Sequence, residues 1–427
     1  MKKRTTTYLT TALLCLTCGL GAYIIPQIIY EPATRVWFHP AFLSAWLRVG
    51  QAMRITSAHY VDPAAVTPEK LASRALASLP ADLDPYSEYL PPKAYDDFQQ
   101  QTNQTYLGIG VTLQLLDGRP TIIRILPGSA AAESGLEPGD SLTHADDAPL
   151  EPLDLATASN RIKGPAGTAV SLRLLRPGHA APLTRSVVRR KTTLPTLADK
   201  RLLPQHTAYL RVTQFESRTA EEISAALAEL TQAGAQRLVL DLRDNPGGLV
   251  SAAVDTVALF CPPNTTVTTA SSRHSTSDRA YRTAAATVSF QQIPIAILVN
   301  RDTASASEIV SGALQDHKRA LIVGDRTHGK GVVQTIYPLD ATDGLKITTA
   351  RYLLPSGRSI QGAGVQPDIF QPMDRRTRIL QTLADTWRDL GREGEYTRRY
   401  GRPPPEDTQL NAALDALNAL ANQRPAK

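Results

Sequence analysis

Cysteine is scarce in this sequence, which contains three cysteines among 427 residues. Cys15 and Cys18 lie within the first 30 residues, so Cys261 is alone in the rest of the chain. A single cysteine can form neither an intramolecular disulfide nor a cysteine cluster that binds a metal. Both are therefore excluded beyond residue 30.

Long basic runs are also lacking, although the net charge is +6. A typical basic run beyond the first 30 residues, Arg189–Lys191, is short and has no aromatic residues near it. Proteins that bind nucleic acid usually concentrate basic residues on one face or stripe. We therefore expect no nucleic-acid partner.

The composition is otherwise that of an ordinary globular protein. Hydrophobic residues make up 42% of the chain and charged residues 20%, which excludes wholesale disorder. A chain of 427 residues is longer than one hydrophobic core usually organises. The length therefore predicts two or three domains.

The first 30 residues have the pattern of an export signal. Basic residues at positions 2–4 precede an uncharged stretch from Tyr8 to Tyr30. Gly19–Ala22 offers small residues for cleavage, yet the stretch is also long enough to span a bilayer. We expect a signal peptide or an uncleaved signal anchor over residues 1–30. The rest of the chain is then exported to the periplasm or cell envelope, and an anchor would attach it to the inner membrane.

Changes in residue pattern divide the remainder into four parts. Residues 31–103 show helical spacing of apolar residues, whereas residues 104–191 contain short β-rich runs separated by Gly and Pro. Strands alternate with helices over residues 192–370, and residues 371–427 are again helical. The order predicts a small β-rich domain followed by an α/β domain.

The α/β part contains apolar runs typical of strands that are covered on both faces. The predicted strands are Leu238–Leu242, Ile295–Val299 and Leu321–Val323, and the predicted helices are Thr219–Ala233, Val250–Phe260 and Ser305–Asp316. Two of these helices begin with the spacing of a capping box, in Thr219 with Glu222 and in Ser305 with Glu308.

Three turns follow these strands, where α/β sheets usually place their sites. The first, Arg243–Gly248, ends in two adjacent glycines, Gly247 and Gly248. Their backbone N–H groups can approach a ligand closely. Taken alone, the pair is explained more simply as a tight turn that needs a positive φ.

The second turn, Thr303–Glu308, opens a helix. The hydroxyl of Ser305 would lie in the positive field of the helix N-terminus. The backbone N–H of Ala306 could then hold an oxyanion that forms when the serine attacks a carbonyl. Taken alone, the Ser-x-x-Glu pattern indicates a helix cap.

The third turn, Gly329–Gln334, places Lys330 between glycines. A lysine there can be a general base, a phosphate ligand or a surface charge. The phosphate-loop pattern is absent, so we do not expect a nucleotide. If Lys330 begins a strand, Gln334 lies on the same face and can hold the amine by a hydrogen bond.

In this order, the three turns resemble those of the C-terminal processing (tail-specific) peptidase family. The matching stretches are LVLDLRDNPGG, ASASEIVSGALQDH, VGDRTHGKGVVQT, KITTARYLLPSGRSIQGAGVQPDI and, in the N-terminal part, LDPYSEYL. The resemblance covers roughly residues 70–370. It implies an α/β fold with a crotonase-like catalytic core of the ClpP/enoyl-hydratase type, which would make residues 192–370 a serine peptidase domain.

The resemblance also implies roles for the residues of the three turns. Ser305 would be the nucleophile, Lys330 the base and Gln334 the residue that orients the lysine. Ala306 and a glycine of the pair at 247–248 would supply the oxyanion donors. The implied chemistry needs no metal and no other cofactor.

Two positions depart from the family pattern. Thr303 stands where the family more often has serine, and His328 stands where it more often has an aromatic residue. The first change is conservative. The second places a titratable group two residues from Lys330, so His328 is a competing candidate for the base.

The β-rich segment resembles a PDZ domain, inserted over residues 104–191. The resemblance rests on Leu107-Gly108-Ile109-Gly110, Gly135–Asp140 and Ile162–Thr168. Backbone N–H groups of the first loop would bind the C-terminal carboxylate of a substrate tail. We therefore expect protein or peptide substrates with free apolar C-termini, because Ile109 and Val111 cannot pair with charge.

A Ser-Lys dyad makes one strong physical demand. Lysine acts as a base only when neutral, and lowering its pKa from about 10.4 to about 7 costs roughly 4 kcal/mol of charged-state stability. Burial of Lys330 is therefore expected. Two alternatives stay open, a crotonase-type enzyme acting on acyl-thioesters and a non-catalytic envelope adaptor that binds tails. The sequence also leaves open an activating envelope partner and a homo-oligomer.

Overall fold

The computed structural model describes residues 39–102, 106–126, 128–192, 196–273, 276, 278–286 and 288–422. The predicted leader, residues 1–30, lies outside them. Within these ranges, no helix combines the length and apolar character of a membrane span. The chain divides into two units, one up to Pro91 and one from Pro92 onward.

The first unit is mainly helical, as the sequence predicts. Its elements are α3 (Pro40–His59), the 3₁₀ helix η1 (Pro63–Ala65), α4 (Pro68–Ala81) and the short strand β1 (Glu88–Leu90). Thr67 caps α4 by accepting a hydrogen bond from the backbone N–H of Lys70. Asp84 accepts from the N–H groups of Tyr86 and Ser87, which forms the turn expected after α4.

The second unit begins with α5 (Pro92–Thr102) and β2 (Tyr106–Gly108), which pairs with β9 (Arg190–Thr192). Between β2 and β9 lies a sheet of order β3-β4-β5-β7-β8, with β6 paired to β5. Its elements are β3 (Val111–Leu116), β4 (Arg119–Ile125), α6 (Ala130–Glu133), β5 (Ser141–Ala145), β6 (Ala148–Pro149), α7 (Leu155–Ile162), β7 (Ala169–Leu175) and β8 (Leu183–Val188). This sheet and its two helices enclose a hydrophobic core of their own.

The central sheet of the second unit has the strand order β10-β11-β12-β15-β16-β19. The strands are β10 (Leu197–Leu203), β11 (Thr207–Val212), β12 (Arg237–Asp241), β15 (Ile295–Val299), β16 (Leu321–Gly324) and β19 (Ile369–Phe370). All neighbours are parallel except β10 and β11. The three predicted strands are confirmed.

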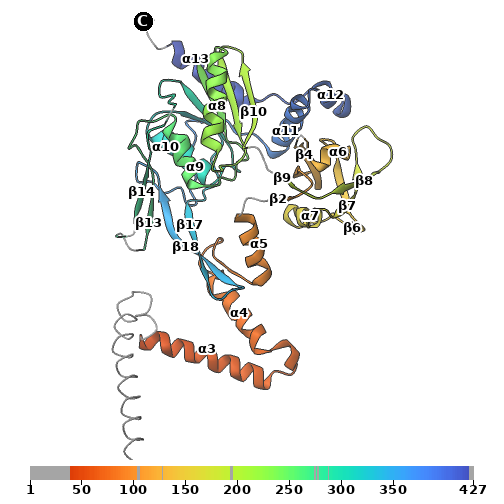
Figure 1. Cartoon of the computed structure of the whole chain (residues 1–427), viewed down its shortest axis with the longest axis vertical. Helices are drawn as coiled ribbons and strands as arrows, with labels where there is room; N and C mark the ends of the chain where they lie inside the picture. Colours follow the sequence, from red (N-terminus) through yellow and green to blue (C-terminus); the bar gives the residue numbers. More distant parts are fainter. Residues whose placement is uncertain are drawn as a thin grey trace, which may run out of the picture. The chain divides into compact units, whose positions relative to one another are not determined.

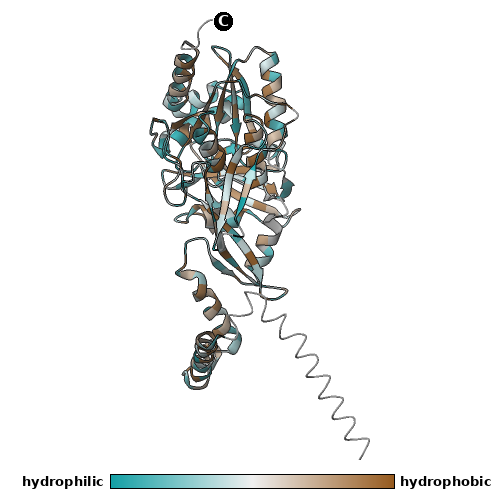
Figure 2. Ribbon diagram, turned by 90° about the vertical axis from the view of Figure 1, so that its left-hand side faces the viewer, coloured by the Kyte–Doolittle hydropathy of each residue, from teal (hydrophilic) through white to brown (hydrophobic). Residues whose placement is uncertain are grey.

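Helices cover this sheet on both faces (Figure 1). One layer consists of α8 (Thr219–Gln232), α9 (Val250–Ala258) and α10 (Ala306–Asp316), and the other contains α13 (Thr408–Asn422). In β12, Leu238 and Leu240 pack against the first layer, whereas Val239 between them packs against α13. Successive strand residues point to opposite faces, so the residues on each face of this strand must be apolar. Figure 2 shows hydrophobic residues, in brown, interspersed with hydrophilic ones along the ribbon of the chain.

A smaller antiparallel sheet lies beside the central one. It is formed by β13 (Thr266–Ser272), β14 (Arg279–Arg282), β17 (Val332–Pro338) and β18 (Gly344–Leu353). Strand β18 pairs with both β17 and β13, so it connects the segment after Lys330 to the rest of the domain.

The C-terminal part is helical, as expected, and its helices pack on two different domains. Helix α11 (Arg375–Asp389) packs with α12 (Gly394–Tyr400) on strand β4, where Ile123 contacts a cluster that includes Leu383 and Trp387. The hydroxyl of Thr386 also donates to the carbonyl of Ile123 at 2.8 Å. Helix α11 therefore packs on the β-rich domain, and the chain that follows it continues through α12 to α13 on the central sheet.

One of the two predicted capping boxes is wrong. Helix α8 begins at Thr219 with Arg218 as its cap residue, and the Thr219 hydroxyl accepts from the N–H of Glu216. Glu222 instead accepts from the hydroxyl of Thr196, on the neighbouring chain segment. Tertiary contacts have overridden the local pattern.

Candidate active site

Ser305 lies in the turn between β15 and α10 and has a backbone conformation that is rare for serine. Its φ is 58° and its ψ is −118°. Non-glycine residues seldom adopt positive φ, and such strained residues cluster at active sites. Helix α10 begins at the next residue, Ala306. The serine therefore stands at the N-terminus of a buried helix, as the sequence predicts.

The carboxylate of Glu308 connects the turn of Ser305 with the turn of Lys330. Its side chain is fully buried. One oxygen, Oε2, accepts from the backbone N–H of Ser305 at 2.8 Å and from that of Lys330 at 2.9 Å. The other, Oε1, accepts from the hydroxyl of Thr327 at 2.5 Å and from the N–H of Gly329 at 2.7 Å.

These bonds bring the predicted nucleophile and the predicted base together. The two bonds end at the same oxygen atom, Oε2, and are 2.8 Å and 2.9 Å long. The backbone nitrogens of Ser305 and Lys330 therefore lie at most about 5.7 Å apart. A carboxylate that accepts several N–H bonds is a strong and directional anchor. Glu308 is thus a positioning residue for both turns.

The surroundings of Lys330 favour the neutral amine. The residue is half-buried, and burial lowers the pKa of its amine below the ordinary value. The positive charge of Lys346, on β18, lowers that pKa further. The side chain of His328, the competing candidate, is exposed.

The segment from Gln361 to Val365 holds the lysine turn from outside. Gln361 accepts from the N–H of Gly331 at 2.9 Å, and Gly362 donates to the carbonyl of Gly329 at 2.9 Å. The N–H of Val365 donates to the Thr327 hydroxyl at 2.7 Å. The Gly-rich segment that closes the family motif therefore holds the turn of Lys330 in place through hydrogen bonds.

The two glycines of the first turn, Gly247 and Gly248, have different roles. Gly247 has a φ of 104°, and a Cβ atom there would lie 2.7 Å from the Ser305 Cβ and 2.8 Å from the Ala306 nitrogen. Only glycine fits so close to the serine. Its own N–H donates to the side-chain oxygen of Asn245 at 2.9 Å. Among the described residues, the N–H groups of Gly248 and Ala306 have no hydrogen-bond partner.

The structure does not support the alternation argument for Gln334. Strand β17 begins at Val332, two residues after Lys330, so the two residues do not share one strand. The recorded contact of Gln334 is a long hydrogen bond of 3.5 Å to the hydroxyl of Thr348. Its role in orienting Lys330 stays a prediction that rests on the resemblance.

The predicted tail-binding loop lies at the junction of β2 and β3. Leu107 and Gly108 belong to β2, where Gly108 pairs with Arg190. Ile109 is buried in the core of the β-rich domain, and Gly110 has a φ of 83°. Strand β3, which follows, has one neighbour, β4, among the described strands of its sheet. No strand that the structure describes pairs with its other edge.

Comparison with known proteins identifies both domains. The model of peptidase family S41 matches residues 206–370, and that of the PDZ domain matches residues 121–176. A carboxyl-terminal-processing protease of Synechocystis sp. is 35% identical over 352 residues, which make up 80% of this chain and 76% of that one. The chain belongs to the carboxyl-terminal-processing proteases of peptidase family S41. The predicted family and enzyme class, a serine-type peptidase, are thereby confirmed.

Two further family members resemble this chain over most of their length. A carboxy-terminal-processing protease of Bartonella bacilliformis is 33% identical over 364 residues, covering 82% of this chain and 83% of that protein. The solved structure of a photosystem II D1 C-terminal processing protease has a TM-score of 0.51 and 28% identity, covering 76% of this chain and 92% of that one. This similarity confirms the predicted α/β fold with its PDZ domain.

Sequence reasoning assigned Glu308 a helix-capping role and missed its contacts with residues 327–330. The Ser-x-x-Glu spacing contained the signal for the first contact. Nothing local indicated the other three, because Thr327, Gly329 and Lys330 follow Glu308 by 19 to 22 residues.

Replacing Glu308 with glutamine should separate positioning from folding. Glu308→Gln keeps the side-chain size but turns one acceptor into an NH₂ donor that faces N–H groups. We expect kcat to fall by roughly 10- to 100-fold with little change in KM, since one or two buried hydrogen bonds are lost. Steady-state kinetics on a protein substrate measure this. The exposed Glu229→Gln is the control, and unchanged kcat in Glu308→Gln would contradict the positioning role.

Proposed function

We propose that this protein is an endopeptidase that cleaves proteins with a Ser305–Lys330 dyad. The observation that carries the proposal is the Glu308 carboxylate, which accepts hydrogen bonds from the backbone of both residues. The lowered pKa of Lys330 supports the same assignment, because a lysine serves as a base only in its neutral form. The side chain of His328 is exposed, and its backbone N–H donates to the carbonyl of Thr303 and not to Glu308.

The reaction is acyl transfer in two steps. Ser305 Oγ attacks the peptide carbonyl while Lys330 Nζ accepts the serine proton. The proton then passes to the leaving amine as the C–N bond breaks, which leaves an acyl-enzyme. Lys330 next accepts a proton from water, the resulting hydroxide attacks the ester, and Ser305 recovers its proton as the acid product leaves.

The oxyanion that forms in each step needs nearby N–H donors. Ala306 and Gly248 are the candidates, since neither N–H has a partner among the described residues. Gly247 has a different task. It allows the turn to lie against Ser305, while its own N–H is held by Asn245. Gln334 is the remaining candidate for orienting the lysine.

The PDZ domain implies that the protein binds peptide C-termini. We infer that Leu107, Gly108, Ile109 and Gly110 receive the terminal carboxylate and that the tail adds to the open edge of β3. Helix α7 contacts β3, so it can form the second wall of the groove. A bound tail raises the local concentration of the same chain at Ser305, so cleavage far from the tail becomes efficient.

We place this activity in the cell envelope. The basic residues at positions 2–4 and the uncharged stretch after them support export through a signal peptide or anchor. Envelope proteins with apolar C-termini are then the substrates. An activating envelope partner, attachment to the inner membrane and a homo-oligomer belong to the same proposal.

Two other functions are weaker. An acyl-thioester enzyme of the crotonase type would not need a PDZ domain or the Ser305–Lys330 pair. A non-catalytic adaptor would not need a strained Ser305 beside free N–H donors. Tail binding without turnover in the unaltered protein would favour the adaptor.

Mutation of the dyad should abolish proteolysis and leave the fold intact. We expect Ser305→Ala and Lys330→Ala each to reduce kcat by roughly 10⁴-fold or more, and the double variant to be no worse than either single. Turnover of a disordered protein with an apolar C-terminus measures this, with the melting temperature as the folding control. His328→Phe should stay active. A loss in His328→Phe that equals the loss in Lys330→Ala would point to histidine as the base.

Activity should rise with pH as Lys330 loses its proton. Since burial lowers the lysine pKa, the midpoint should lie below the ordinary value of about 10.4. Removing the nearby positive charge by Lys346→Met should raise that pKa and move the rising limb to higher pH. The measurement is kcat/KM between about pH 5 and 9. A profile that is flat or falls over this range would exclude Lys330 as the base.

Substrate tails should be selected by their free C-terminus. Amidating the terminus should raise KM by roughly 10-fold or more because charge-assisted hydrogen bonds are lost. Appending Asp-Asp should also raise KM, because charged side chains would then have to enter an apolar pocket. Gly108→Val should have a similar effect, since a Cβ at Gly108 meets no atom within 4 Å and the fold can accept it. Gly394→Val, at an equally open position, is the control. Equal KM for amidated and free-acid substrates would refute tail recognition.

A further inference from the structure

The glycine turn, Arg243–Gly248, carries the proposed oxyanion donor Gly248 and has an unusual backbone conformation. Asp244 has a φ of 62°, and Gly247 and Gly248 have φ values of 104° and 140°. Residues other than glycine seldom adopt positive φ, and a strained backbone persists only where its surroundings hold it. Contacts from outside the turn must therefore keep it in this conformation.

Asn245, in the middle of the turn, joins it to two neighbouring segments. Its side-chain oxygen accepts from the N–H of Gly247 at 2.9 Å, and its side-chain NH₂ donates to the carbonyl of Val212, on β11, at 2.9 Å. Its backbone carbonyl accepts from the N–H of Ala304, one residue before Ser305, at 3.0 Å. A shift of Asn245 would therefore move the glycine pair relative to the serine.

The guanidinium of Arg243, at the start of the turn, is fully buried and uses all of its donors. An arginine side chain has five N–H groups. Nε and Nη2 donate to the two carboxylate oxygens of Asp241 at 2.9 Å and 2.7 Å. Nη1 and Nη2 donate to the two oxygens of Asp407, both at 2.8 Å, and Nη1 also donates to the side chain of Gln409 at 3.1 Å. The arginine is thus held between two carboxylates, with a bidentate pair to each.

Two of these acceptors come from the C-terminal part of the chain. Asp407 and Gln409 follow Arg243 by 164 and 166 residues and lie where α13 begins. The carboxylate of Asp407 also accepts from the N–H of Leu410 at 3.0 Å, so it caps the helix. The side chain of Gln409 donates to the carbonyl of Gln371, just after β19, at 2.7 Å. The start of α13 is therefore tied to the central sheet at two points.

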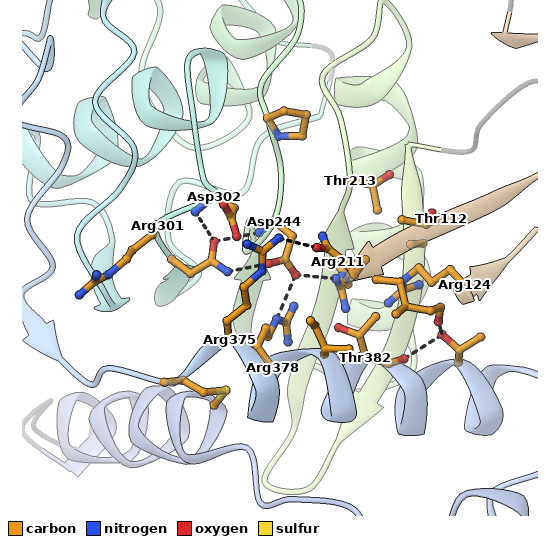
Figure 3. A pocket seen from close by; sticks show the side chains of 18 of the residues that line it. Thr112, Arg124, Arg211, Thr213, Asp244, Arg301, Asp302, Arg375, Arg378 and Thr382 are labelled. Atoms are coloured by element: carbon orange, nitrogen blue, oxygen red, sulfur yellow. Dashed lines mark hydrogen bonds and ion pairs between the residues drawn. The ribbon is translucent and has the colours of Figure 1, made fainter. Parts of the chain in front are cut away.

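Asp244, the next residue of the turn, is held by a second C-terminal element. Its carboxylate accepts from Arg211 of β11 at 3.2 Å and from Arg378 of α11 at 3.0 Å (Figure 3). Asn300 donates to the same carboxylate at 2.7 Å and accepts from the backbone N–H of Asp244 at 2.9 Å. These residues line a cavity of about 870 Å³ between the PDZ domain, α11 and the central sheet. Helix α11 and the start of α13 thus hold adjacent residues of the turn.

We propose that Asp407 is a positioning residue for the oxyanion site and acts through Arg243. The carboxylate fixes the guanidinium, which fixes the chain where it leaves β12, and the turn then presents the N–H of Gly248 to the scissile carbonyl. Bidentate pairs of arginine and carboxylate are strong and directional. A misplacement of about 1 Å at a catalytic group can lower the rate by roughly 100-fold. This role rests on the proposed function, because it requires Gly248 to bind the oxyanion.

Both members of the pair are charged at neutral pH. Burial alone would raise the pKa of Asp407, but the positive charge of Arg243 outweighs it and lowers that pKa. Burial alone would lower the pKa of Arg243, but the charges of Asp241 and Asp407 outweigh it and raise that pKa. The ion pair is therefore intact under the conditions in which Lys330 acts as a base.

The first test compares kcat and KM in Asp407→Asn. This change removes the charge but keeps the helix cap, because Asn and Asp cap helices about equally well. We expect kcat to fall by roughly 10-fold with KM unchanged within about 2-fold, since oxyanion donors act on the transition state. Asp407→Glu, which keeps the charge, should recover part of the loss. Asp415→Asn, at an exposed position of the same helix, is the control and should change neither constant.

A peptide aldehyde separates an oxyanion role from a general loss of structure. Ser305 Oγ adds to the aldehyde carbon, the serine proton passes to Lys330, and the oxyanion of the adduct lies at the same N–H donors as in catalysis. In Asp407→Asn, the inhibition constant should rise by about the factor by which kcat falls. Affinity for an uncleaved substrate, measured in Ser305→Ala with and without Asp407→Asn, should stay within about 2-fold.

The outcomes distinguish this role from the proposed function. Equal aldehyde inhibition of the unaltered enzyme and Asp407→Asn, a kcat equal to that of Asp415→Asn, or a substrate affinity that falls as much as kcat would refute the role of Asp407 alone. An aldehyde that does not inhibit the unaltered enzyme would refute the proposed Ser305 chemistry and this role with it. If Asp407→Asn does not fold, Gln409→Met replaces it and should lower kcat by roughly 3-fold, because it removes one neutral acceptor from the same guanidinium.

Discussion

The buried carboxylate of Glu308 is the interaction on which the catalytic arrangement depends. It accepts hydrogen bonds from the backbone of Ser305, Gly329 and Lys330 and from the hydroxyl of Thr327. A fully buried carboxylate is unstable without such donors. The same bonds that satisfy Glu308 therefore hold two turns from different strands of the central sheet against each other. The N–H of His328 also donates to the carbonyl of Thr303 at 2.9 Å, which joins the same two turns a second time.

The rest of the fold supports that link from both sides. Below it, α10 is buried between α9, the central sheet and the smaller sheet, so the N-terminus of the helix cannot shift freely. On the other side, the side chain of Gln361 accepts from the N–H of Gly331, and the backbone N–H groups of Gly362 and Val365 donate to Gly329 and Thr327. Gly247 then lies so close to Ser305 that a Cβ atom would have to displace backbone. The packing and hydrogen bonds of these neighbours hold each active-site group in one position.

The second consequence of the fold concerns the C-terminal helices. Helix α11 packs on the PDZ strand β4 through Leu383 and Trp387, and α13 covers the central sheet through Ala413 and Leu417. The C-terminal helices thus contribute to two hydrophobic cores whose other residues lie far from these helices in the sequence. They also supply Arg378, which meets Arg211 and Asp244 at the cavity between the domains. The cavity exists only because these distant segments pack together.

Much of the architecture follows from local patterns. The apolar runs predicted strands that are covered on both faces, and β12, β15 and β16 are such strands. The helices at 219, 250 and 306 begin at or one residue after their predicted starts. Predictions were weaker where a side chain could choose between local and distant partners. Thr219 and Glu222 have capping-box spacing, yet each finds another partner in the folded chain.

The sequence by itself determined the family, the α/β fold with its PDZ domain, and the order of the three turns. The α/β alternation follows from periodicity, whereas the family and the PDZ domain follow from motifs that resemble those of known families, and both kinds of signal are local to the chain. The tertiary structure decided which groups meet: Glu308 with the turn of Lys330, Gly247 with Ser305, and Asp407 with Arg243. Such contacts join residues separated by tens to hundreds of positions. Local spacing carries no information about them, because they arise only when separate elements pack and compete for the same buried space.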